Sequence, residues 1–161
     1  MPRRALVMRV PSFSGLKPAS QAASLAKRMN RRADTAHEKL LRGLLWRRGF
    51  RFRKNVAALA GKPDIVFTRA RLVVFCDGDF WHGRRWHELS KKLEKRANAV
   101  YWCQKIRANM LRDRRTTRLL RRQHWRVIRL WEGDIREDPE RAVRRVERAL
   151  LGRPKSKPCA S

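Results

Sequence analysis

One run of five apolar residues, LVVFC at positions 72–76, constrains the fold of this chain more than any other feature. A strand that is apolar throughout lies in the centre of a sheet and is covered on both faces. A shorter apolar strand is predicted at residues 64–67, and a turn at residues 68–71 joins the two. A further core strand is predicted at residues 125–131. Helices are therefore expected on both faces of the sheet.

Amphipathic helices are predicted before and after the first two strands. Residues 37–48 place four leucines on one face, and Gly49 is the expected stop. A long helix is predicted over residues 100–122, with a basic face opposite an apolar one. The apolar face carries Trp102, Ile106, Met110, Thr117 and Leu120.

A last helix is marked by its end signals. Asp138 is the expected N-cap, Pro139 takes the first helical position, and Gly152 follows the end. Residues 79–99 are polar with several aromatic side chains and are expected to form a loop region. The order is helix, three or four strands, long helix, strand, helix. It predicts an α/β fold with a mixed central sheet flanked by helices.

The folded domain is expected to span residues 23–152, with helical character from Ala23 onward. Residues 1–22 contain prolines, a glycine and serines and are expected to form a flexible basic arm. Residues 153–161 are expected to form a disordered tail.

The charge of the chain is strongly unbalanced. Lys and Arg number 42 against 14 Asp and Glu, which gives a formal net charge of +28 over 161 residues. A polyanionic partner relieves such self-repulsion, and nucleic acid is the default candidate. The charge alone does not choose among DNA, RNA and the ribosome.

The cysteines and the hydropathy bound the compartment. None of the three cysteines stands in a CxxC pair, which indicates a reduced, cytoplasmic protein without a zinc-binding spacing. No apolar run approaches the roughly 20 residues that span a bilayer. We therefore expect no membrane partner.

Acidic residues gather at the ends of the two hairpin strands. Asp64 leads the first strand, and Asp77 and Asp79 close the second. A hairpin brings such groups together, and carboxylate oxygens hold the Mg²⁺ that assists phosphodiester cleavage. The alternative is that these aspartates only end the strands.

Phe80, Trp81 and His82 follow directly. Two large aromatics in a polar loop can wedge between base pairs or stack on an extruded base. His82 has the right intrinsic pKa for a general base or acid. The alternative is a loop anchored by buried aromatics with an uninvolved histidine.

The long helix carries a candidate phosphate-binding face. Lys105, Asn109 and Arg112 share one side at helical spacing. The usual alternative is a solvated basic face, and we expect only solvation for three arginines farther along: Arg118, Arg121 and Arg122.

Five segments, in order, resemble the very-short-patch-repair endonucleases, which share the restriction-endonuclease-like fold. They are MNRRADTAHEKLLRGLLWRRGFRFR, KPDIVF, VVFCDGDFWHG, YWCQKIRANMLRDRR and WRVIRLWE. The resemblance covers residues 25–132, about two thirds of the chain. It implies a monomeric, Mg²⁺-dependent endonuclease that nicks one strand of double-stranded DNA beside a T:G mismatch.

The resemblance also implies roles for individual residues. Asp64 resembles the metal-binding catalytic aspartate, and Cys76 stands where a main-chain carbonyl makes a second metal contact. His82 resembles the histidine that acts on the attacking water, and Phe80 and Trp81 match an aromatic wedge. Trp102 matches a further inserted aromatic, and Glu38 matches an acid near the active site. Asp113 matches a site acid, although it could equally pair with a neighbouring arginine, Arg112 or Arg114.

Two departures from the family pattern stand out. The structural zinc of the best-known members is expected to be absent, because its ligand positions here read Asp79, Arg84, Trp86 or His87, and Gly133. An Arg84–Asp79 pair or the packing of Trp86 is expected to hold the loop instead. Asp77 stands where some members have a second active-site histidine, and it is expected to add a metal ligand.

Three functions remain open on these grounds. The first is a mismatch-directed nicking endonuclease that uses Mg²⁺. The second is a restriction-type or mobile-element endonuclease that cuts a particular sequence. The third is a non-catalytic nucleic-acid-binding protein.

Overall fold

The computed structural model describes residues 34–96 and 98–152, which form two compact units. The sheet unit comprises residues 34–78 and 116–152, and the loop unit comprises residues 79–115. Each unit is described by itself below. The predicted arm at residues 1–22, the helical start at Ala23 and the tail at residues 153–161 lie outside the described residues.

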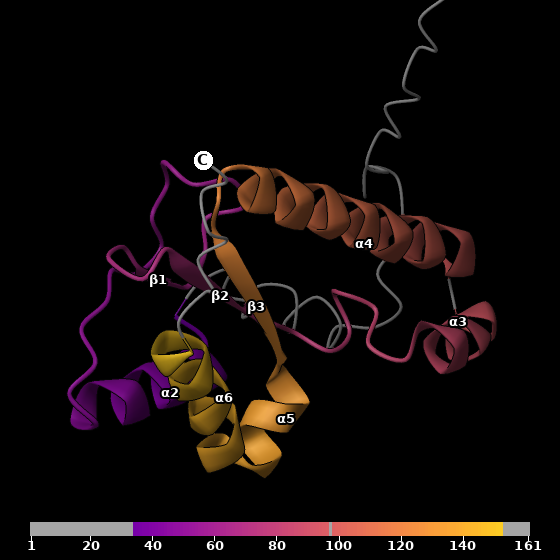
Figure 1. The fold of residues 1–161 in the computed structure, drawn as a ribbon. Helices are drawn as coiled ribbons and strands as arrows, with labels where there is room; N and C mark the ends of the chain where they lie inside the picture. The colour runs from indigo at the N-terminus through magenta and orange to yellow at the C-terminus, as the bar shows by residue number, and fades with distance from the viewer. Residues whose placement is uncertain (1–33, 97, 153–161) are drawn as a thin grey trace, which may run out of the picture. The chain divides into compact units, whose positions relative to one another are not determined.

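The sheet unit is built on three strands in the order β1-β2-β3 (Figure 1). Strand β1 (Ile65–Phe67) pairs antiparallel with β2 (Leu72–Asp77), with Ile65 opposite Val74. Strand β3 (Arg126–Trp131) pairs parallel with β2, with Leu72 opposite Arg126. The predicted mixed α/β sheet is confirmed, and the apolar run at residues 72–76 is its central strand.

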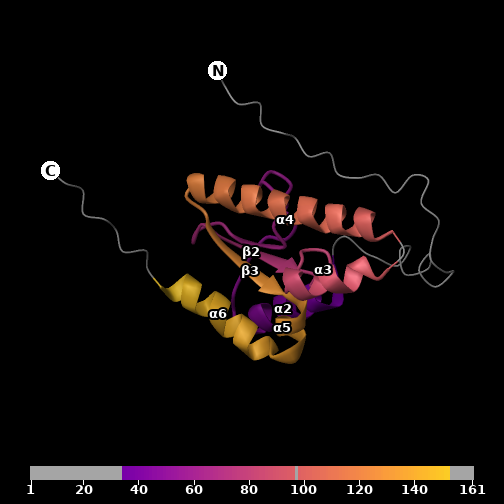
Figure 2. The ribbon, with the colours of Figure 1, turned by 90° about the vertical axis from the view of Figure 1, so that its right-hand side faces the viewer.

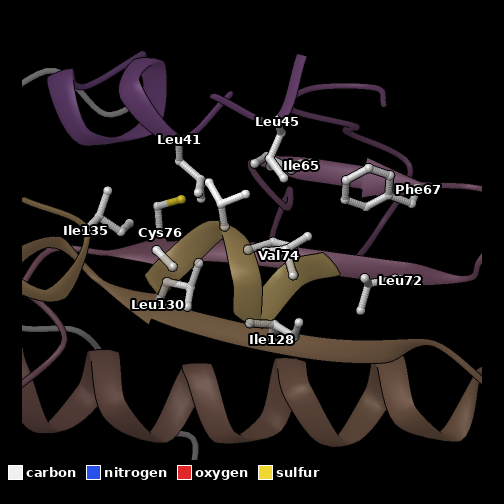
Figure 3. Packing of buried hydrophobic residues seen from close by; sticks show 13 residues of the cluster. Leu41, Leu45, Ile65, Phe67, Leu72, Val74, Cys76, Ile128, Leu130 and Ile135 are labelled. Carbon is white, nitrogen blue, oxygen red and sulfur yellow. The ribbon is translucent and has the colours of Figure 1, made fainter. Parts of the chain in front are cut away.

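Three helices cover one face of the sheet: α2 (Ala36–Arg47), α5 (Glu132–Glu137) and α6 (Pro139–Leu151). Figures 1 and 2 show them together on one side of the strands. Alternate strand residues point toward them, as in Figure 3, where Leu41 and Leu45 of α2 pack near Ile65, Val74 and Cys76. Both leucines are fully buried, which contributes roughly 1.5–3 kcal/mol each.

The other face of the sheet is buried as well. Its residues Val66, Val73 and Phe75 form a second cluster with Leu120, from the last turns of α4 (Ala99–Arg122). Strand β2 is therefore covered on both faces, as its apolar sequence predicts.

The predicted helix ends are confirmed. Asp138 caps α6 by accepting a hydrogen bond from the Arg141 backbone N–H at 2.8 Å, and Pro139 is the first residue of the helix. Gly49 follows α2 with a φ of +85°, a left-handed conformation that glycine adopts without strain. One detail differs, because Leu40 is 39% exposed whereas Leu41 and Leu45 are buried.

Three elements differ from the sequence prediction. Residues 86–94, predicted as loop, form helix α3 (Trp86–Glu94). Trp86, Leu89 and Leu93 stand at helical spacing, but Leu93 alone is buried. The short helix α5 directly follows β3 and was not predicted. The extended stretch after Phe50 makes a single bridge, Arg53 to Val66, so within the described residues the sheet has three strands. No helix of the described ranges is long and apolar enough to cross a membrane.

Candidate active site

Asp64 stands immediately before β1 and faces the end of β2. Its backbone N–H donates to the Val74 carbonyl at 3.1 Å, and its Oδ2 accepts from the Cys76 N–H at 2.7 Å. The N–H and C=O of one strand residue point to the same side, so the Cys76 carbonyl lies along the same edge of β2. The strand pairing thus places one carboxylate and one main-chain oxygen together.

The surroundings of Asp64 oppose its ionisation. Burial raises its pKa to about 6, and the charges of Glu38 and Asp77 add to this, against the Cys76 N–H and Arg42, which lower it. A buried carboxyl among other carboxyls is a site that a cation would stabilise.

The Cys76 side chain is a core residue rather than a ligand. Its sulfur packs in the cluster under α2, and burial raises the pKa of the thiol well above its ordinary value. A neutral thiol is a poor metal ligand. The geometry therefore favours the expected main-chain contact at this position.

Glu38 is fixed in the first turn of α2. It is 3% exposed, its Oε1 accepts from the Thr35 hydroxyl at 2.8 Å, and its Oε2 accepts from the Asp34 N–H at 2.9 Å. These bonds form a capping arrangement that holds the carboxylate near Asp64. The expected acid beside the site is thus supplied by the start of a helix.

Arg42 was missed by the sequence analysis. Its Nη2 lies 2.5 Å from Asp34 Oδ1 and 3.6 Å from Glu38 Oε2. Its Nη1 is buried, with no hydrogen-bond partner within the described part of the chain. Spacing of i,i+4 between Glu38 and Arg42 was the only available signal, and such pairs are common on exposed helices.

Few side chains at this site could act as metal ligands. Among the described residues no group of three or more His, Cys, Asp or Glu side chains could hold a metal ion. Asp64 and a main-chain carbonyl, with Glu38 close by, nevertheless fit Mg²⁺, which is held by one or two carboxylates and keeps several waters. Asp77, the third expected ligand, accepts hydrogen bonds from Arg129 with both oxygens.

The loop unit gathers the predicted aromatic residues. The ring centroids of Phe80 and Trp81 are 5.2 Å apart, those of Phe80 and Trp102 5.7 Å, and those of Trp81 and Trp102 5.9 Å. All three side chains are only half-buried. They form a single aromatic cluster that remains partly open to solvent.

His82 and Asp113 form a hydrogen-bonded pair in the same unit. Nδ1 of His82 lies 2.6 Å from Oδ2 of Asp113, and the two side chains are 24% and 17% exposed. A carboxylate on Nδ1 orients the ring and fixes its tautomer. The sequence analysis left Asp113 open to a neighbouring arginine and did not foresee this contact with His82.

The loop that carries His82 is fixed at three points. Arg84 Nη1 lies 3.3 Å from Asp79 Oδ2, which is the ion pair expected in place of zinc. The Asn109 amide donates to the Trp81 carbonyl at 2.9 Å, and a Cβ on Gly83 would meet Met110 Sδ at 2.6 Å.

The three helix residues predicted to bind phosphates differ in their exposure to solvent. Asn109 is 6% exposed and bonds to the loop, so its side chain is turned inward. Lys105 is half-buried and Arg112 is exposed. Trp86, the other suggested anchor, is half-buried with the Arg107 guanidinium 5.6 Å from its ring centroid.

Comparisons with known proteins identify relatives of this chain. The family model of the DNA mismatch endonuclease Vsr matches residues 17–88. The type II nicking enzyme V.HpaIIP of Haemophilus parainfluenzae is 33% identical over 133 residues, 83% of this chain and 93% of that protein. V.NaeI of Lentzea aerocolonigenes, also a type II nicking enzyme, is 39% identical over 137 residues, 81% and 80% of the two chains. The DNA mismatch endonuclease Vsr of Escherichia coli K12 is 41% identical over 103 residues, 64% of each.

A mixed sheet flanked by helices is the restriction-endonuclease-like fold, and the family match makes the protein an endodeoxyribonuclease. Within that class the chain belongs to the Vsr endonuclease family. The third reading, a non-catalytic nucleic-acid-binding protein, is set aside by this membership.

Proposed function

We propose that this protein nicks one strand of double-stranded DNA at T:G mismatches, as a monomer and with Mg²⁺ bound at Asp64. The observation that carries the proposal is the buried Asp64 carboxyl, whose pKa is raised to about 6 by burial, Glu38 and Asp77. Relatives named as nicking enzymes support single-strand cleavage, and the Vsr relative supports mismatch recognition.

Asp64 and the Cys76 carbonyl would hold the Mg²⁺, with Glu38 close by. The ion supplies Lewis-acid stabilisation of charge on the scissile phosphate and lowers the pKa of water. The protein contributes pre-oriented carboxylates, because Cys76 N–H fixes one oxygen of Asp64 and Thr35 fixes one of Glu38.

His82 is proposed to accept a proton from the attacking water at Nε2. Asp113, 2.6 Å from Nδ1, would hold the ring in place and stabilise its protonated form. General base catalysis of this kind contributes roughly 10²- to 10⁴-fold in rate.

Phe80, Trp81 and Trp102 are proposed to open the base stack beside the cut. Their rings pack against one another and are partly exposed, which suits insertion at a weakened base step. Lys105 and Arg112 would contact phosphates, since they lie on one side of α4 and retain solvent exposure.

A second candidate function is nicking at a matched recognition sequence. The loop after β2 carries an Arg84–Asp79 ion pair at two positions that resemble zinc ligands in the best-known members, so the recognition surface can differ from that of mismatch enzymes. Nothing in the catalytic groups would need to change for this function.

The test is strand cleavage on two labelled duplexes of the same sequence that differ only by one T:G pair. Nicking confined to the mismatched duplex and dependent on Mg²⁺ is expected. Asp64→Ala should abolish cleavage and retain DNA binding. Cutting of both duplexes alike would instead establish the sequence-directed function, and cleavage by Asp64→Ala would refute the site.

A further inference from the structure

A bidentate ion pair joins β2 to β3 beside the candidate metal site. Asp77, the last residue of β2, is 3% exposed, and Arg129 lies on β3 opposite Phe75. Nε of Arg129 donates to Oδ2 of Asp77 and Nη2 donates to Oδ1, both at 2.6 Å. Both carboxylate oxygens thus accept from one guanidinium, in the strongest geometry for this pair.

Arg129 is itself held in place. Its guanidinium carbon lies 4.7 Å from the centroid of the Phe75 ring, and its Nη1 is 3.5 Å from the Thr117 hydroxyl. Its side chain is 23% exposed. Turning Asp77 toward Asp64 would leave a largely buried guanidinium without its anion, which is costly.

We propose that Arg129 is a positioning residue that holds Asp77 outside the metal's ligand set and fixes the end of β2. The inference rests on the proposed Mg²⁺ site at Asp64. A guanidinium that already neutralises Asp77 also repels any cation that this carboxylate could bind. The metal is left with Asp64 and a main-chain carbonyl, a sparse ligand set that leaves room for the waters that Mg²⁺ retains.

Fixing Asp77 also fixes its neighbour. Cys76 supplies both the N–H that orients the Asp64 carboxylate and the carbonyl proposed to contact the metal. A bond network at residue 77 therefore constrains the main chain on which both groups depend. Loss of Arg129 should lower kcat for cleavage with little change in KM for DNA.

Mn²⁺ titration of the DNA-free protein by calorimetry tests the ligand assignment. Asp77→Asn should bind Mn²⁺ within about threefold of wild type, whereas Asp64→Asn should weaken it by about tenfold or more. Arg129→Met releases Asp77 toward the metal, so binding should tighten by about threefold or more. Asp77→Asn in the Arg129→Met background should remove that gain.

Two results would overturn the inference. One is a loss of Mn²⁺ binding by Asp77→Asn as large as that of Asp64→Asn, which would make Asp77 a direct ligand. The other is an unchanged affinity in Arg129→Met. If Arg129→Met does not fold, Arg129→Gln also removes the positive charge while keeping a polar side chain, and serves in its place.

Thermal unfolding in EDTA separates this inference from the proposed function. Arg129→Met should lower Tm, and the double variant should recover at least half of the loss, because the unpaired buried carboxylate is gone. A wild-type protein that neither cuts DNA nor binds Mn²⁺ would refute the Mg²⁺ proposal. Even then, the recovery of Tm in the double variant in EDTA would show whether Arg129 and Asp77 are energetically coupled. A double variant with no recovery of Tm would refute the Arg129–Asp77 pairing.

Discussion

At the scale of single residues, the stability of the fold and the proposed reaction favour different protonation states of Asp64. Its carboxyl is buried near Glu38 and Asp77, which favours the protonated form in the metal-free protein. Cation binding requires the ionised form. The fold therefore tolerates a destabilising group that the proposed reaction needs.

This conflict predicts a pH-dependent stability in EDTA. The folded pKa of Asp64, about 6, lies above its unfolded value, so the stabilising contribution of the protonated form is present below about pH 4. That contribution is lost as pH rises through 6. Asp64→Asn, whose side-chain oxygen can still accept from Cys76 N–H, should therefore have a Tm several degrees above wild type at pH 8.

The gap between the two proteins should close as pH falls from 7 to 4, and differential scanning calorimetry measures it. Mg²⁺ should raise the Tm of wild type at pH 8 and leave Asp64→Asn unchanged. A Tm difference of equal size at pH 5 and pH 8 would contradict the assignment.

The sequence indicates candidate catalytic residues but not the side chains that contact them. Asp64, Glu38 and His82 were proposed through segments that resemble a family. Arg129 was read as part of a core strand, and its partner Asp77 lies 52 residues away, so no local pattern connects them. The partner of Asp113, 31 residues away, was likewise open between arginines until the fold brought His82 to it.

At the scale of elements, prediction followed the apolar pattern. Strand β2 and helix α6 carry clear burial and capping signals, and both were predicted. Helix α3 has nine residues and α5 has six, so neither fills the window of about 11–18 residues in which helical periodicity is read. Polar elements beside a functional loop are where sequence patterns carry least information.

The loop before α3 gives a prediction at this scale. Gly83 has a φ of +70°, and a Cβ there would lie 2.6 Å from Met110 Sδ and 3.1 Å from Ile106 Cγ2. Gly83→Ala should therefore displace the neighbouring His82, lowering kcat by about tenfold or more. Tm should fall by a few degrees, because the left-handed conformation and the contact are both strained.

Gly43→Ala is the matched control for this substitution. Gly43 lies within α2, and a Cβ there meets nothing within 4 Å. Alanine is favoured in a helix by about 1 kcal/mol, so Tm should rise by about 2–4 °C with cleavage unchanged. Equal activities in the two variants would show that the loop does not depend on the close packing at Gly83.

At the scale of the whole molecule, the basic residues behind the net charge of +28 serve different purposes. Several arginines serve the fold: Arg48 pairs with Glu140 and Glu147, and Arg126 donates to the carbonyls of Ala70 and Gly152. Helix α4 differs, because Asp113 is the single acid in its 24 residues and bonds to His82. Its basic residues are thus a concentrated source of positive charge for a polyanion.

The last prediction separates contacting charges from solvated ones on α4. DNA affinity of the cleavage-deficient Asp64→Asn protein is measured against salt, where each phosphate contact contributes about 0.9 to the slope of log K. Adding Lys105→Ala and Arg112→Ala should reduce the slope by about 2, if both contact phosphates. Arg118→Ala with Arg121→Ala removes the same charge from exposed positions expected only to be solvated, so the slope should hardly change. Equal losses in both pairs would mean that the helix attracts DNA by diffuse charge, and the assignment of Lys105 and Arg112 as contacts would be wrong.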